Sequence, residues 1–251
     1  MNIDWLRTKR PNVKTSSPIT DTRPRSGAAE AYRTLRTNVR FLNLTDAYRS
    51  LVFTSATAGE GKTTTASNFS VATAQSGARV CLIDADLRRP SLHRTFRLSN
   101  QSGLTTALIH RESAAALAQP TRVPNLFVLT SGALPPNPAE LVASSRMRDL
   151  ITDAQTAFDL VVLDTPPIIS VGDPVAISAQ CDGVIIVIRA SQVPLEVIRR
   201  AIGQVAAVRA RIIGVVLNRV NLRREGYYYK YYHYYQSYYS SGATTVRGTE
   251  G

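Results

Sequence analysis

Six short runs of β-branched and aliphatic residues constrain the fold of this chain more than any other feature. They read LVFTS, RVCLIDAD, NLFVLTSG, DLVVLDTPP, GVIIVIRA and RIIGVVLNRV, and the segments between them are long enough to form helices. Strands that are apolar throughout and alternate with helices are typical of a parallel sheet covered on both faces. The sequence therefore predicts an α/β protein with a mostly parallel sheet flanked by helices.

Length and composition agree with one α/β domain and two extensions. With 251 residues, 44% of them hydrophobic, the chain can bury a full core. We expect a flexible basic arm over residues 1–25, a folded domain over 26–222 and a mobile tyrosine-rich tail over 223–251, because aliphatic residues become scarce in the tail and the arm lacks periodicity. Residues 28–42 have apolar positions at spacings of three and four, which predicts an amphipathic helix.

Charge and cysteine content bear on the partners and the compartment. The formal net charge is +12, and residues 1–50 carry ten Arg or Lys against four acids. Such an arm can attract nucleic acid, an anionic membrane face or an acidic partner, or can be a solvated lead-in. No apolar stretch approaches the roughly 20 residues that cross a bilayer. With two cysteines and no signal-peptide pattern, we expect a cytoplasmic chain.

The segment SATAGEGKTTT, residues 55–65, follows one expected strand and opens an expected helix near Lys62. This is the context of a phosphate-binding P-loop, and it predicts a P-loop NTPase fold. Glycines let backbone N–H groups face phosphate oxygens at the positive end of the helix dipole. Lys62 is expected to reach the β- and γ-phosphates of ATP and Thr63 to bind Mg²⁺. The predicted nucleotide contacts are Ala58, Gly59, Glu60, Gly61, Lys62, Thr63 and Thr64.

Three carboxylates follow other expected strands. Asp84 and Asp86 lie in VCLIDADLRRP, and Asp164 lies in LVVLDTPP. Because parallel strands bring their carboxyl ends to one rim, we expect the three to converge beside the P-loop as a metal and proton-transfer site. Helix capping is the alternative for any single one. Asn218, at the end of the last apolar run, is placed either to contact adenine or to form a turn.

Residues 226–240, GYYYKYYHYYQSYYS, hold nine of the eleven tyrosines. Taken alone, they indicate an aromatic low-complexity segment that adheres to membranes, sugars or itself. In a chain with a P-loop they are predicted phosphoacceptors. A phenol has a pKa near ~10, so its phosphorylation needs a base and a γ-phosphate held in line, which a P-loop site with aspartates can supply. The predicted acceptors are Tyr227, Tyr228, Tyr229, Tyr231, Tyr232, Tyr234, Tyr235, Tyr238 and Tyr239.

Together, SATAGEGKTTT, CLIDADLRRP, LVVLDTPP, EAYRTLR and the C-terminal tyrosine cluster resemble the bacterial tyrosine kinases of capsule and exopolysaccharide synthesis, from about residue 28 to 240. The resemblance implies an ATP- and Mg²⁺-dependent protein-tyrosine kinase that phosphorylates its own cluster in trans and regulates polysaccharide synthesis and export. It implies that Lys62, Asp84, Asp86 and Asp164 are catalytic and that Thr63, Asp84 and Asp164 hold the metal. Whether Asp84 or Asp86 takes the phenolic proton stays open.

The resemblance also implies partners. Glu30, Arg33 and Arg36 recur every three residues on one side of a helix. By spacing alone they form a solvated charged face, whereas the family assigns this pattern to subunit contact in a ring-like homo-oligomer. Family kinases of this split type pair with a separate transmembrane activator, a polysaccharide co-polymerase, which would hold the chain at the inner face of the plasma membrane. We also expect a cognate phosphotyrosine phosphatase and no specific nucleic acid.

Two other functions stay open from sequence. A partitioning or cell-division-positioning ATPase shares this fold and would direct its charge at DNA or membrane. Such ATPases typically carry an additional lysine early in the P-loop, where this chain has Thr57. A nucleotide-dependent scaffold that regulates a polysaccharide export complex and barely hydrolyses ATP is the second. A eukaryotic-type kinase is excluded, since neither H-R-D nor D-F-G occurs.

Overall fold

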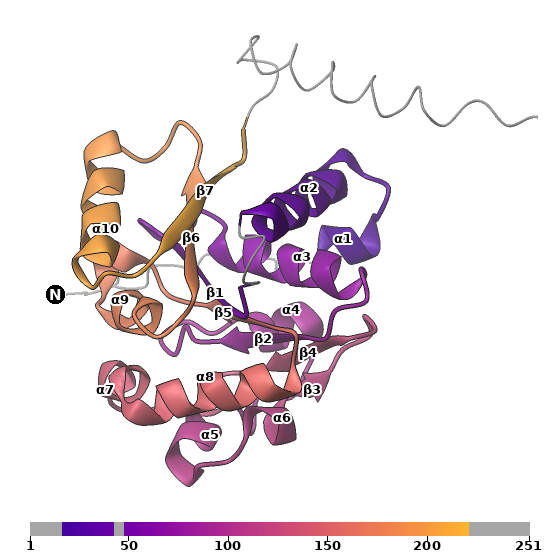
Figure 1. The fold of residues 1–251 in the computed structure, drawn as a ribbon, viewed down its shortest axis with the longest axis vertical. Coiled ribbons are helices and arrows are strands. Elements are labelled where there is room, and N and C mark those ends of the chain that lie inside the picture. The colour runs from indigo at the N-terminus through magenta and orange to yellow at the C-terminus, as the bar shows by residue number, and fades with distance from the viewer. Residues whose placement is uncertain (1–16, 43–47, 221–251) are drawn as a thin grey trace, which may run out of the picture.

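The computed structural model describes residues 17–42 and 48–220, which form a twisted sheet between two layers of helices (Figure 1). The sheet has seven strands in the order β3-β4-β2-β5-β1-β6-β7. Six strands are parallel, and the short β3 pairs antiparallel with β4 at one edge. The strands are β1 (Ser50–Ser55), β2 (Val80–Asp84), β3 (Gln119–Pro120), β4 (Leu126–Leu129), β5 (Leu160–Asp164), β6 (Gly183–Arg189) and β7 (Ile212–Asn218). The predicted α/β fold with a mostly parallel sheet is confirmed.

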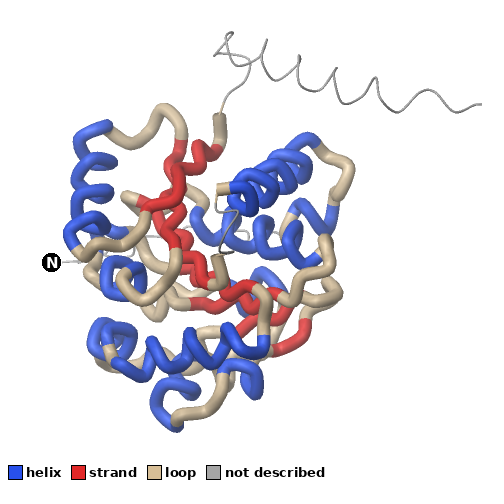
Figure 2. Tube along the Cα trace, in the orientation of Figure 1, coloured by secondary structure: helices blue, strands red, loops and turns tan. Residues whose placement is uncertain are grey.

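Helices cover both faces of this sheet (Figure 2). One face carries α1 (Ile19–Thr22), α2 (Gly27–Phe41), α3 (Lys62–Ala74) and α4 (Leu92–Phe96). The other face carries α5 (Leu104–His110), α6 (Ala114–Leu117), α7 (Pro138–Ala143), α8 (Ser145–Ala157), the 3-10 turn η2 (Ile168–Ser170), α9 (Asp173–Ser178) and α10 (Leu195–Ala207). The amphipathic helix expected over residues 28–42 is α2. Among the described residues, no helix is both long enough and apolar enough to cross a bilayer.

Each face of the sheet packs against its own apolar core. Along β2, Val80 and Leu82 enter the core beneath α3, whereas Cys81 and Ile83 enter the core beneath α8. This alternation follows from the two-residue period of a strand, in which successive side chains point to opposite faces. Because both faces are covered, the strands are apolar throughout, which is why they stand out in the sequence.

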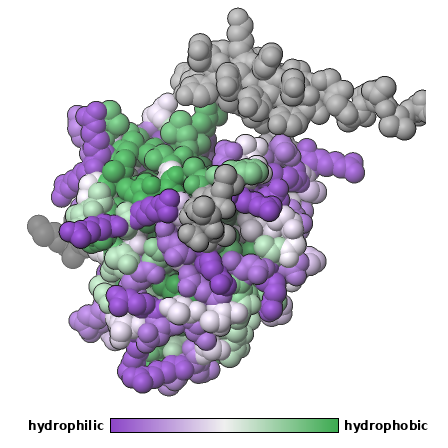
Figure 3. All heavy atoms as spheres, viewed as in Figure 1, coloured by the Kyte–Doolittle hydropathy of each residue, from purple (hydrophilic) through white to green (hydrophobic). Residues whose placement is uncertain are grey.

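The edge formed by β7 is less completely covered. Figure 3 shows apolar atoms gathered over the region of β7 and α10. Val215 and Leu217 on β7, and Leu195 and Val208 at the two ends of α10, are exposed. Because β7 is an edge strand with a neighbour on one side only, part of its apolar face stays open to solvent.

The strand register determines where the candidate site forms. Asp84, the last residue of β2, is the register partner of Asp164, the last residue of β5. On the other side of β5, Asp164 is the partner of Phe53 near the end of β1. The two carboxylates therefore lie side by side at the rim from which the segment 56–61 leads into α3.

Part of the predicted flexible arm is packed against the domain. Thr20 of α1 is fully buried, and its N–H and hydroxyl each donate a hydrogen bond of 3.0 Å to Oδ1 of Asn68 on α3. The prediction of a flexible arm over residues 1–25 is therefore wrong for Ile19–Thr22, because composition carries no sign of this long-range contact. Residues 1–16 of the arm and the predicted tail, residues 223–251, lie outside the described residues.

We predict that Asn68→Ala destabilises the domain and releases α1. The substitution leaves the buried N–H and hydroxyl of Thr20 without their acceptor, which costs about 1–3 kcal/mol. Urea unfolding should show this loss, and trypsin should cleave faster after Arg25. Ser76→Ala, which removes only a local hydrogen bond to Thr73 O, is the control. An Asn68→Ala variant as stable and as protease-resistant as the parent would refute this role for the contact.

Candidate functional site

The segment between β1 and α3 turns on two glycines in the left-handed region. Gly59 has φ +83° and Gly61 has φ +98°, values that a residue with a Cβ rarely adopts. Gly61 caps α3, whose first residue is Lys62, so the predicted helix start is confirmed. A helix of 13 residues therefore begins at the P-loop with its N-terminus directed at the rim of the sheet.

Lys62 lies among the predicted carboxylates. Its Nζ is 2.9 Å from Oδ2 of Asp86, 3.5 Å from Oδ1 of Asp164 and 3.3 Å from Oγ1 of Thr63. Asp84 stands next to Asp164 through the strand register. The structure thus brings together Lys62, Thr63, Asp84, Asp86 and Asp164, which are far apart in the sequence.

Two of these carboxylates also accept hydrogen bonds from backbone N–H groups. Oδ2 of Asp84 accepts from the N–H groups of Ser91 and Leu92 at 2.9 Å each, where α4 begins. Oδ1 of Asp86 accepts from the N–H of Arg89 at 2.9 Å. One oxygen of Asp84 therefore caps α4, as in the capping alternative considered for single carboxylates. Its other oxygen remains available to the site.

Burial dominates the electrostatics of the site. Burial, with repulsion from Asp164 as a second cause, raises the pKa of Asp84 to about 7. Burial also raises the pKa of Asp164, although Lys62 opposes the shift. Burial lowers the pKa of Lys62, but attraction to Asp164, Asp86 and Asp84 outweighs it, so the net pKa of Lys62 is raised. Because these charged groups are buried, water screens them little, and they would interact strongly with a cation or a phosphate that enters the site.

Two buried oxygens fit a hard cation. Oδ1 of Asp84 and Oδ2 of Asp164 have no hydrogen-bond partner within the described part of the chain. Mg²⁺ is bound in phosphoryl-transfer sites through one or two carboxylates, substrate phosphates and water. The hydroxyl of Thr63 belongs to the same cluster, 3.3 Å from Nζ of Lys62. In residues 17–42 and 48–220, no group of three or more His, Cys, Asp or Glu side chains is placed to hold a metal ion.

Glu60 and Asn218 make contacts that the sequence did not reveal. The carboxylate of Glu60 turns inward and accepts from the N–H and hydroxyl of Thr57 and from the N–H of Arg189. Nδ2 of Asn218 donates to Glu60 O at 2.8 Å, and its Oδ1 accepts from the N–H of Arg219 at 2.8 Å. Asn218 therefore lies beside the P-loop, as expected, with its amide bound to backbone groups in the manner of a turn residue.

An ion pair outside the predicted set ties the segment after β2 to α9. Nε and Nη2 of Arg88 lie 2.8 and 3.2 Å from the two carboxylate oxygens of Asp173, which is buried. The sequence around Asp173 indicates only a residue at the start of a helix, and nothing pairs it with Arg88. The contact depends on the fold and has no local signal.

The residues expected to contact a second subunit lie on α2, away from Lys62. Glu30 pairs with Arg33 at 2.7 Å, and Arg33 also donates to Pro24 O at 2.6 Å. Arg36 donates to Ala72 O at 3.1 Å. These side chains thus contact their own chain here, while Glu30 remains 62% exposed. The predicted acceptors Tyr227–Tyr239 lie outside the described residues.

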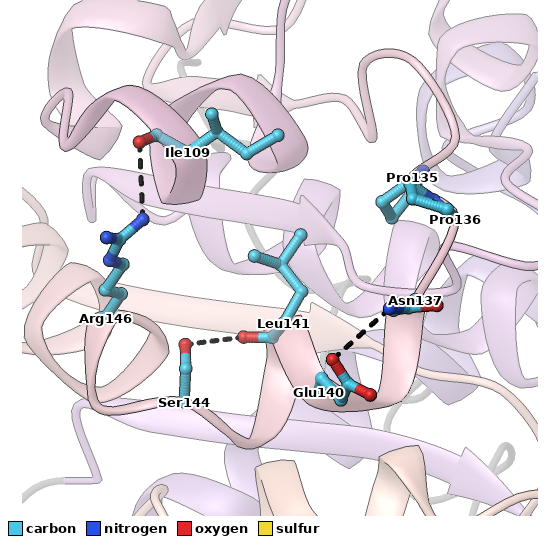
Figure 4. A pocket seen from close by; sticks show the side chains of 8 residues that line it. All are labelled: Ile109, Pro135, Pro136, Asn137, Glu140, Leu141, Ser144 and Arg146. Atoms are coloured by element: carbon cyan, nitrogen blue, oxygen red, sulfur yellow. Dashed lines mark hydrogen bonds between the residues drawn. The ribbon is translucent and has the colours of Figure 1, made fainter.

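A separate hollow of about 290 Å³ lies between the ends of α5, α7 and α8 (Figure 4). Its apolar lining comes from Ile109, Pro135, Pro136 and Leu141, and Arg146 beside it donates to Ile109 O. None of the predicted site residues lines it. The candidate site is therefore the open rim around Lys62 and not this hollow.

Comparison with known proteins identifies the family of this chain. A ParA family model, described as NUBPL iron-transfer P-loop NTPase, matches residues 47–243. The tyrosine-protein kinase YwqD of Bacillus subtilis is 40% identical over 226 residues, which are 89% of this chain and 95% of that protein.

Two solved structures share the architecture. The chimerical protein CapA2B2 is 33% identical with a TM-score of 0.76, covering 82% of this chain and 92% of that one. The kinase domain of the Escherichia coli tyrosine kinase ETK is 29% identical with a TM-score of 0.74, covering 82% of this chain and 91% of that one.

We predict that Asp84→Asn stabilises the nucleotide-free protein at high pH. The Asp84 carboxyl has an ordinary pKa of 3.8 and a pKa of about 7 in the fold, so the folded state holds the extra proton between these values. Stability therefore falls as pH rises through this window, and the cost is complete above it.

The amide introduced by Asp84→Asn cannot ionise, yet its oxygen can still accept from Ser91 and Leu92. Denaturant unfolding without Mg²⁺ should show a gain on the order of 1–4 kcal/mol at pH 8 that disappears near pH 4. A variant no more stable than the parent at pH 8 would contradict the raised pKa of Asp84.

Proposed function

The chain belongs to the bacterial tyrosine-protein kinases, within the ParA-type P-loop NTPases, and we propose that it is an ATP-dependent autokinase whose substrate is its own tyrosine cluster. The observation that supports this most is the contact of Lys62 with Asp86 and Asp164 at the P-loop. The same chain carries nine tyrosines in residues 226–240, a dense set of acceptors.

Each part of the site has a role in the proposed reaction. Residues 58–64 hold the nucleotide phosphates through backbone groups, and the ammonium of Lys62 compensates the charge of the β- and γ-phosphates. Thr63, Asp84 and Asp164 are the residues that would hold Mg²⁺. When bound, the ion neutralises charge on the phosphoryl group.

We assign the proton acceptor to Asp86, the choice that the sequence left open. Asp84 is fully buried and uses one oxygen at the start of α4, whereas Asp86 keeps some exposure at the rim and contacts Lys62. A phenol arriving from solvent therefore meets Asp86 first. In the proposed step the phenolic oxygen bonds to the γ-phosphorus, the bond to the β–γ bridging oxygen breaks, ADP leaves and the phenolic proton passes to Asp86.

Most of the rate acceleration in this scheme comes from positioning and charge compensation. An aspartate is a weak base toward a phenol, since the ordinary pKa values of the two groups differ by about six units. In-line placement and the cationic loop supply the larger contributions. Many acceptors on one segment raise their local concentration at the active site of a neighbouring copy, which favours phosphorylation in trans.

The wider role follows from the family. We propose that the kinase regulates capsule or exopolysaccharide synthesis and export, assembles as a ring-like homo-oligomer through Glu30, Arg33 and Arg36, and works beside a transmembrane activator at the inner face of the plasma membrane. A cognate phosphatase would reset the tyrosines. A positioning ATPase is less well supported because Thr57, at the position of the additional lysine, binds the Glu60 carboxylate. Phosphotyrosine on the purified chain distinguishes the kinase from a nucleotide-dependent scaffold.

We predict that Lys62→Met abolishes autophosphorylation but leaves the chain a substrate. Removing the ammonium leaves phosphate charge uncompensated, and the rate should fall by about 10²–10³-fold. Mixed with an active partner truncated before residue 223, the full-length Lys62→Met chain should gain phosphotyrosine, measured by mass spectrometry. Parent levels of phosphotyrosine in isolated Lys62→Met would reject the site assignment, and an unmodified chain in the mixture would reject phosphorylation in trans.

A second prediction concerns assembly. Replacing Glu30, Arg33 and Arg36 together by Ala removes the charged side of α2 and should shift the light-scattering mass toward the monomer at low salt. Arg199→Ala, which removes an exposed arginine of α10 on the other face of the sheet, is the control and should keep the parent mass. Melting curves of both variants show whether the loss of the Arg36 bond to Ala72 O has merely loosened α2. If the triple variant keeps its mass, these residues do not form the subunit contact.

A further inference from the structure

A buried carboxylate inside the P-loop is unexplained by phosphate binding. Glu60 is only 2% exposed, although its neighbours Ala58 and Gly59 are exposed. Burying a carboxylate is costly unless hydrogen bonds compensate it, and a negative group in a phosphate-binding loop opposes the ligand. The side chain therefore needs a structural purpose that outweighs both costs.

The contacts of Glu60 reach three separate parts of the fold. One carboxylate oxygen accepts from the N–H and hydroxyl of Thr57 at the start of the loop, and the other accepts from the N–H of Arg189 at the end of β6, at 3.1 Å. The backbone oxygen of Glu60 accepts from Nδ2 of Asn218 at the end of β7, at 2.8 Å. All of these contacts are to groups of the protein itself, and they leave the Glu60 side chain buried.

These contacts restrain the part of the loop that is otherwise freest. Glu60 lies between Gly59 and Gly61, both at positive φ, and glycines leave the intervening peptide groups free to rotate. A Cβ on Gly61 would lie 2.0 Å from Nδ2 of Asn218, so the amide packs directly against the glycine. Asn218 is itself held, because its backbone oxygen accepts from the N–H of Ala190 at 2.9 Å.

We propose that Glu60 and Asn218 are positioning residues that clamp the P-loop to the ends of β6 and β7, and thereby set the loop backbone for the phosphates of a nucleotide. A loop that binds anions through its N–H groups gains affinity when these groups are ordered before binding. The clamp rests on nucleotide binding by the P-loop and extends it. It acts on the phosphates of the ligand and not on its base.

The test measures nucleotide affinity directly, so its result does not depend on kinase activity. Glu60→Gln keeps one acceptor oxygen but sets an NH₂ group against either Arg189 N–H or Thr57 N–H, and breaks one arm of the clamp. Calorimetry with Mg²⁺ and the full chain should show ADP affinity about tenfold weaker, the scale of one hydrogen bond to a charged group. In phosphorylation assays KM for ATP should rise while kcat stays near the parent value.

Asp182→Ala, which removes the acceptor altogether, is the matched control. The Asp182 carboxylate also accepts two backbone N–H bonds, from Arg49 at 2.9 Å and Ser50 at 2.8 Å, but at the opposite end of β1. This variant should lose stability while its ADP affinity stays unchanged. Equal losses of ADP affinity in Asp182→Ala and Glu60→Gln would show a general effect of destabilisation and overturn the clamp, as would parent affinity in Glu60→Gln.

A second variant separates the clamp from recognition of adenine. Asn218→Leu removes the amide donor to Glu60 O, keeps a side chain of similar size and adds no charge beside the loop. The clamp predicts that inorganic tripolyphosphate, measured by competition against a fluorescent ADP, loses affinity by the same factor as ADP. Weaker ADP binding with unchanged tripolyphosphate binding would instead assign Asn218 to the base and remove it from the clamp.

Discussion

The attraction between one ammonium and the carboxylates around it is the interaction on which this site depends. The sheet register forces Asp84 and Asp164 together in a buried setting, where the charged form of each is unfavourable. Lys62 reaches this pair from the first residue of α3 and also contacts Asp86. Without that cation, the rim of the sheet would concentrate negative charge where a polyphosphate has to bind.

The same arrangement explains how the loop and the strands act as one unit. Lys62 is placed by the glycine turn, and the turn is placed by the ends of β6 and β7 through Glu60 and Asn218. The carboxylates are placed by β2 and β5. A ligand that carries negative phosphates and a divalent cation can replace each of these internal contacts with a stronger one, since the phosphates take Lys62 and the cation takes the unpartnered oxygens of Asp84 and Asp164. This exchange makes the site suited to nucleotide-dependent phosphoryl transfer.

Much of this could be predicted from sequence because it is encoded locally. Buried parallel strands are continuous apolar runs, the P-loop is a glycine pattern between a strand and a helix, and Asp84 and Asp164 mark strand ends that must share a rim. The unpredicted features join residues distant in sequence. Glu60 and Arg189 are 129 positions apart, and Thr20 meets Asn68 across 48. Neither composition nor hydrophobic periodicity predicts these contacts. The buried position of the Glu60 side chain and the packing of α1 could therefore be found only in the structure.

The proposed roles of the site residues, of the neighbouring copy and of the phosphatase all depend on phosphorylation of the tyrosine cluster by this site. It is tested most directly by phosphosite mapping with mass spectrometry of the purified parent chain, before and after incubation with Mg²⁺ and ATP. If the cluster is the substrate, new phosphate appears on tyrosines in residues 226–240, and none on serine or threonine. Consumption of ATP with every tyrosine of the cluster unmodified would contradict the proposed reaction and would point to a positioning ATPase or a nucleotide-dependent scaffold.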